Sequence, residues 1–287
     1  MIPSRSALLV GDSWLVAPAG FAPAGPVPEL FGLDQETRAL IAQFPQFKSI
    51  LNECPDQQAR SEMIHRLEIL ASADPRSGRP APEESELVDS LSAVLLLLDD
   101  IGTGVRLTSA GYLPPKIAYR FGEVLGLRDF ELSTGGESKM LAVMHVREAL
   151  QQVGLLRKYK GDLLLTKAAK DGQEATPLLW NHLAARLLPS EPTAGTFSHD
   201  AALLSLLFAA TSDNSFDLTT VAEILTASGW RVNDEPVQSY DVVFQGSWQT
   251  ILLWYIAPKD QRAWFNGTVS PAAAELARAT LLTAKPL

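Results

Sequence analysis

The sequence has a single cysteine, Cys54, among its 287 residues. One thiol excludes an intramolecular disulfide, and the scarcity of cysteine favours a reducing compartment. Long apolar runs are also missing, because the longest, Ala93–Leu98, falls well short of the roughly 20 residues that span a bilayer. A run at Ala7–Val10 is broken by Gly11-Asp12 and is too short for the core of a signal peptide. We therefore expect a cytoplasmic protein with no transmembrane segment.

Motifs that would carry catalysis or hold a cofactor are incomplete. The stretch VGDSW at 10–14 resembles the start of a serine hydrolase, but such an enzyme also needs an Asp-x-x-His, and the last histidine here is His199. EMIH at 62–65 has the spacing of one half of a carboxylate-bridged metal site and lacks a second copy. STGGESK at 133–139 lacks the Gly-Lys-Ser/Thr of a phosphate loop. We predict no catalytic residue, no metal and no cofactor, and hence a protein that binds rather than catalyses.

Negative charge dominates the chain, which carries a net charge of −9. On average such a chain repels nucleic acid and anionic membranes. Residues 139–170 are the exception, with 7 lysines and arginines against 2 acidic residues, whereas the segments on both sides are acidic. An anionic partner is therefore expected at this basic segment.

Two stretches rich in proline, glycine and serine divide the chain. They lie at 73–85 and 189–195, and segments of this composition are typical linkers. We expect a helical N-terminal region at 1–80, with helical periodicity in 34–52 and 57–72, and two further units at 81–191 and 192–287. The fold class expected is mainly α with small β-hairpins.

The middle unit has an informative order of elements. Apolar spacing predicts a buried helix at 86–99, a helix that opens at Pro114-Pro115, and a third helix at about 139–153 that ends at Gly154. GVRLTSAG at 104–111 is expected to form a short strand. A hairpin follows at 154–170, where Lys160-Gly161 supplies the turn.

Helix, strand, helix, helix, strand, strand is the order of a winged-helix domain, in which the hairpin is the wing and the helix before it is the recognition helix. The sequence resembles winged-helix transcription regulators, whose wing ends in a Leu-Thr-x-x-Gly-like step. LTSAG, from Leu107, has that step, and LLLTKAAK keeps Leu-Thr but has Ala169 where glycine is expected. Residues 86–188 also resemble an uncharacterised actinobacterial family. These resemblances imply a fold and no established activity.

The C-terminal unit repeats the order more weakly. Helices are expected at 199–212, within 216–230 after a short extended start, and at 248–257. Two short strands about Asn266-Gly267 and a helix capped by Ser270 follow. The architecture expected is thus tandem winged-helix-like units after a helical N-terminal region. The wing expected in the C-terminal unit carries only Arg262, so we expect this unit to bind phosphate poorly.

The basic helix and wing of the middle unit form the candidate nucleic-acid site. The residues that could contact phosphates or base edges are Lys139, His145, Arg147, Gln151, Arg157, Lys158 and Lys160. Five neutralised phosphates would give a slope of log K against log salt of about −4 to −5. The connection at 128–138 is much longer than the turn of a DNA-reading helix-turn-helix, and exposed lysines and arginines can simply solvate a surface.

A protein-interaction or scaffold module is the alternative. The C-terminal unit is rich in large aromatic side chains, namely Trp230, Trp248, Trp254, Trp264 and Phe265. They can form an ordinary core, or part of them can remain on a face for a protein partner or a homodimer.

Overall fold

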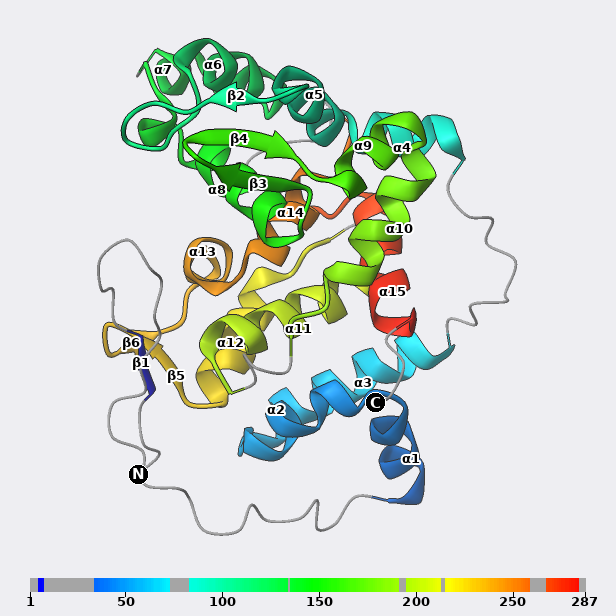
Figure 1. Cartoon of the computed structure of the whole chain (residues 1–287). Coiled ribbons are helices and arrows are strands. Elements are labelled where there is room, and N and C mark those ends of the chain that lie inside the picture. Colours follow the sequence, from blue (N-terminus) through cyan, green and yellow to red (C-terminus); the bar gives the residue numbers. More distant parts are fainter. Residues whose placement is uncertain are drawn as a thin grey trace.

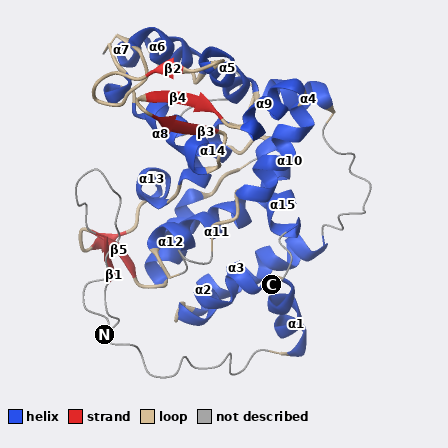
Figure 2. Ribbon diagram, viewed as in Figure 1, coloured by secondary structure: helices blue, strands red, loops and turns tan. Residues whose placement is uncertain are grey.

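The structure is a computed structural model that describes residues 5–7, 34–72, 83–133, 135–190, 195–212, 215–258 and 267–283. It is mainly helical with two small sheets, as the composition and periodicity predict (Figure 1; Figure 2). The VGDSW motif lies outside the described residues. Every helix in the described ranges is too short or too polar to cross a membrane.

The N-terminal part contributes one strand and three helices. They are β1 (Arg5–Ala7), α1 (Gln35–Gln43), α2 (Lys48–Glu53) and α3 (Gln57–Ser72). The helical segment expected at 34–52 is broken after Gln43, because Pro45 disfavours helical geometry at the residue before it and Phe44 has φ −126° and ψ 63°. The helix expected at 57–72 is confirmed.

The middle part contains seven helices and a three-stranded sheet among its described residues. They are α4 (Glu84–Ser90), α5 (Ser92–Ile101), β2 (Val105–Arg106), α6 (Pro115–Val124), α7 (Asp129–Leu132), α8 (Leu141–Gln152), β3 (Leu156–Tyr159), β4 (Asp162–Leu165), α9 (Lys167–Glu174) and α10 (Thr176–Arg186). The single helix expected at 86–99 is wrong, since Leu91, with ψ 5°, separates α4 from α5. The expected connection at 128–138 holds the short helix α7.

The hairpin forms as its sequence predicts. β3 pairs antiparallel with β4, and β4 pairs with β2, so β3 lies at an edge of the sheet. Lys160 and Gly161 make the turn with φ values of 50° and 85°, which are the positive values of a tight two-residue hairpin.

The C-terminal part packs several helices around a central one. They are α11 (Phe197–Ala210), α12 (Leu218–Ala227), β5 (Trp230–Val232), β6 (Glu235–Pro236), α13 (Ser239–Asp241), a π-helix (Val242–Gly246), α14 (Trp248–Tyr255) and α15 (Pro271–Thr283). Ser270 caps α15 as predicted, because its hydroxyl accepts from the N–H of Ala273 at 3.0 Å.

The hairpin of this part lies elsewhere than expected. β5 and β6 join through Asn233-Asp234, both at positive φ, and β5 also pairs in parallel with β1. Of the two strands expected about Asn266-Gly267, residues 261–266 lie outside the described residues, and Thr268 makes an isolated bridge to Ser215.

A continuous hydrophobic cluster joins the three parts. It runs from Leu40 to Leu281 and includes α11, which is buried on nearly all sides, and the predicted apolar stripe of α8. α8 packs against α14, so the expected recognition helix meets the C-terminal part of the chain (Figure 1). The division at residues 80 and 191 stays a prediction.

Candidate nucleic-acid interface

The β3–β4 hairpin holds three of the predicted residues as exposed cations. Arg157, Lys158 and Lys160 are all exposed, and so is the side chain of Lys139 ahead of α8. Side chains alternate along a strand, so Arg157 and Tyr159 lie on one face of β3 while Lys158 shares the other face with its partner Leu163. The hairpin therefore presents positive charge on both faces.

An aromatic ring lies between two of these cations. Tyr159 is 52% exposed. The Arg157 guanidinium carbon lies 5.7 Å from the centroid of its ring, and the Lys160 Nζ lies 5.2 Å from it. These distances are within cation–π range, so Tyr159 keeps Arg157 and Lys160 together at the turn.

Arg106 supports the turn from the neighbouring strand. Its Nη1 donates to the carbonyl of Lys160 at 2.7 Å and pairs with Asp162 at 3.2 Å, and its side chain is 73% exposed. The guanidinium lies so close to Gly161 that a Cβ at that position would be 3.0 Å from Nη1. Gly161 therefore provides both the positive φ and the space for Arg106.

Arg147 does not belong to this surface. Its side chain is 1% exposed and forms an ion pair through Nε with Glu137, whose side chain is 0% exposed. Glu137 also accepts from the backbone N–H of Leu113, and Arg147 contacts Glu148 at 3.3 Å. The predicted phosphate contact at Arg147 is thus replaced by a structural role, since a buried guanidinium needs a carboxylate partner.

Gln151 takes part in the same network. Its side-chain oxygen accepts a hydrogen bond from Nη1 of Arg147, and the residue is half-buried. Its expected role in reading base edges would require this hydrogen bond to break.

His145 faces the C-terminal part of the chain. Its ring contacts Phe244 with centroids 5.8 Å apart, and it lines a small apolar cavity with Ile251 and Trp254. Its Nδ1 is buried and has no hydrogen-bond partner among the residues that the structure describes. Burial lowers the pKa of His145 below its ordinary value, while Glu148 acts in the opposite direction. The expected contact of His145 with base edges is therefore not available in this arrangement.

The structure brings together part of the predicted set. Arg157, Lys158 and Lys160 share the hairpin, whereas His145, Arg147 and Gln151 are engaged inside the protein. Sequence reasoning missed Tyr159 and Arg106. The signal for Arg106 was its place in the short strand expected at 104–111, which the structure pairs with the hairpin. No group of three or more metal-binding side chains occurs in the part of the chain that the structure describes.

Comparison of the chain with protein families, with curated proteins and with solved structures found no match in any of the three.

Proposed function

We propose that this protein is a non-enzymatic, transcription-regulator-like protein that binds nucleic acid through the wing of a winged-helix-like unit. The observation that carries the proposal is the exposed cationic turn of the β3–β4 hairpin, with Arg157, Lys158 and Lys160 around Tyr159. Lysine and arginine at such a position contact phosphates and supply affinity without reading the base sequence.

The role of α8 in this proposal is smaller than the sequence suggests. His145, Arg147 and Gln151 have partners within the fold or face α14. What remains for phosphate is the hairpin together with Lys139, so binding of limited sequence preference is the expected mode.

Binding of a duplex DNA at low salt tests the proposal. We expect the wild type to bind, and Lys158→Ala/Lys160→Ala to lose most of the affinity, because two of four exposed phosphate contacts are removed. Fluorescence anisotropy of a labelled duplex measures both.

The matched control is Lys48→Ala/Lys116→Ala, which removes the same charge from exposed positions on α2 and α6. Its affinity should stay close to that of the wild type. Equal losses in both double variants would mean that net charge alone determines binding, and the wing would lose its assigned role.

Protein interaction is a second candidate function. A separate feature favours it, namely a groove beside α12 that is lined by the carboxylates of Asp56 and Glu223.

A further inference from the structure

The face of α12 that points away from the core borders a groove. Next to β5 and β6 the groove has a volume of about 590 Å³, and next to α3 it has a volume of about 750 Å³. Asp56, Glu223 and Ala227 line both parts, so the two parts adjoin. These volumes fall in the range of sites that hold a ligand or a few partner side chains.

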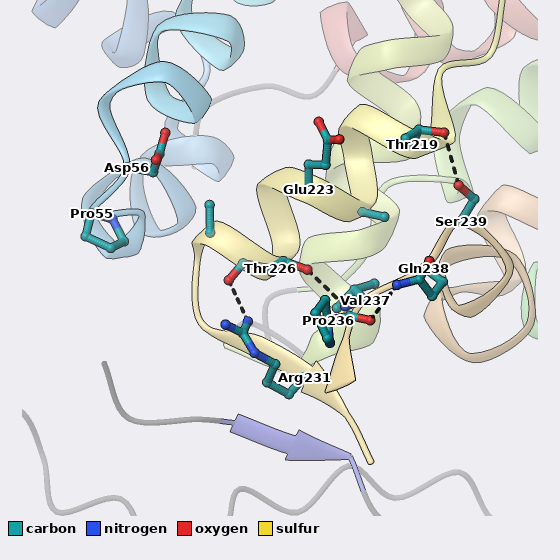
Figure 3. Close-up of a pocket in the computed structure, with 12 residues that line it drawn as sticks. Pro55, Asp56, Thr219, Glu223, Thr226, Arg231, Pro236, Val237, Gln238 and Ser239 are labelled. Atoms are coloured by element: carbon teal, nitrogen blue, oxygen red, sulfur yellow. Dashed lines mark hydrogen bonds between the residues drawn. The ribbon is translucent and has the colours of Figure 1, made fainter. Parts of the chain in front are cut away.

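The groove has an apolar floor with carboxylates around it. Ala222, Ile224 and Val237 are buried side chains of its lining. Figure 3 shows Asp56 from the α2–α3 loop and Glu223 from α12 on two sides of the opening. Glu62 and Asp217 line the part next to α3. The groove therefore offers apolar contact surrounded by negative charge.

Two arginines offset part of this charge, since Arg66 pairs with Glu62 at 2.8 Å and Arg231 lines the part next to β5. The Nη1 of Arg231 donates to the carbonyls of Thr226 and Trp230 at 2.8 Å and 2.7 Å, which holds the guanidinium against the backbone at one edge. Glu223 is exposed and forms no ion pair with any described residue. A cationic occupant is therefore favoured over an anionic one.

The β3–β4 turn has the complementary chemistry. It presents Arg157, Lys158 and Lys160 together with the half-exposed ring of Tyr159, in a chain whose net charge is −9. Figure 1 shows this hairpin in the upper part of the molecule, apart from α12 and β5 in the lower part. The turn and the groove of two different copies can therefore meet.

We propose that the groove beside α12 receives the β3–β4 turn of a second copy of this chain. The cations of the turn face Glu223 and Asp56, and Tyr159 adds apolar contact with the floor. Because two different surfaces meet, the contact is head-to-tail, and successive copies add to the free turn or the free groove at each end. The same turn is used by nucleic acid in the proposed function, so the two partners compete, but self-association does not depend on nucleic-acid binding.

Sedimentation velocity over a range of chain concentrations at low salt tests the proposal. We expect the mean mass of the wild type to grow with concentration, and to fall again when salt is raised, because salt screens exposed charges. Glu223→Lys in the groove and Lys158→Glu/Lys160→Glu in the turn should each weaken association at least tenfold. Glu123→Lys, which reverses an exposed charge on α6, should associate as the wild type does.

Mixing the two variants is the decisive step. The intact turn of Glu223→Lys should meet the intact groove of Lys158→Glu/Lys160→Glu, so an equimolar mixture should associate although neither variant does so alone. Recovery in the mixture also shows that both variants are folded.

Three results would overturn the proposal. They are a wild type that stays monomeric at about 1 mM, a groove variant that associates normally, and a mixture that remains monomeric. The failure of self-association and the failure of nucleic-acid binding are distinguishable, because Glu223→Lys leaves the wing intact and should keep its affinity for the duplex.

Discussion

Two arginines ten residues apart have opposite environments in this chain. Arg147 is enclosed with Glu137, while Arg157 is exposed beside Tyr159. Removal of one member of a buried ion pair leaves an uncompensated charge and costs about 3–5 kcal/mol. We expect Arg147→Met to lower the free energy of unfolding by that amount, as measured by urea denaturation.

The matched double variant separates stability from binding. Glu137→Gln/Arg147→Met removes both charges and should recover a large part of the lost stability. It should also bind duplex DNA as the wild type does, because neither side chain reaches the surface. A selective loss of DNA affinity in a folded double variant would return Arg147 to the binding site.

His145 gives the stability of the fold a dependence on pH. Burial lowers its pKa in the folded chain below the ordinary value of 6.5, so the unfolded chain binds the proton more tightly. The stabilising contribution is therefore complete above about pH 6.5 and decreases as the pH falls from there towards the folded pKa.

The comparison of wild type with His145→Leu isolates this effect. Between pH 7 and pH 5 the wild type should lose more free energy of unfolding than His145→Leu, whose side chain does not titrate. Urea denaturation at both pH values provides the difference. If the free energies of unfolding of the two proteins differ by the same amount at pH 7 and at pH 5, burial does not lower the pKa of His145.

At the scale of the element, the hairpin turn allows geometry and charge to be separated. Gly161 has φ 85° and lies against Arg106, so Gly161→Ala should cost about 1–2 kcal/mol of stability. Asparagine tolerates positive φ, so Lys160→Asn should keep the melting temperature and still weaken DNA binding. Thermal unfolding and anisotropy together test this pair, and a Gly161→Ala variant as stable as the wild type would contradict the turn geometry.

Local patterns were sufficient to predict the elements that matter most to the proposal. The apolar stripe of α8, its end at Gly154 and the turn at Lys160-Gly161 all follow from periodicity and from the need for positive φ. The C-terminus of α8 has the capping hydrogen bond that a glycine at this position implies. The N–H of Leu155 donates to the carbonyl of Leu150 at 2.9 Å.

Contacts between distant segments were beyond this reasoning. The burial of Arg147 depends on Glu137, which belongs to a preceding 3₁₀ turn, and the position of His145 depends on Phe244 almost one hundred residues later. The hairpin of β5 and β6 was missed although Asn233-Asp234 is a suitable turn pair. Three of the seven candidate residues are thus engaged by tertiary packing that leaves no periodic signal.

The whole molecule has a strongly uneven charge distribution. A chain of net charge −9 displays its exposed cations of residues 139–170 on the β3–β4 hairpin, just ahead of α8 and on α9, and an acidic groove borders α12. Electrostatic fields of this kind orient an approaching anion toward the hairpin. They also make every association of this protein dependent on ionic strength.

The salt dependence of duplex binding tests the central claim most directly. With Lys139, Arg157, Lys158 and Lys160 as the phosphate contacts, a plot of log K against log salt should have a slope of about −3.6, and Lys158→Ala/Lys160→Ala should reduce its size by about 1.8. A slope near zero, or the same slope in both proteins, would contradict the assignment of the β3–β4 turn as the nucleic-acid contact.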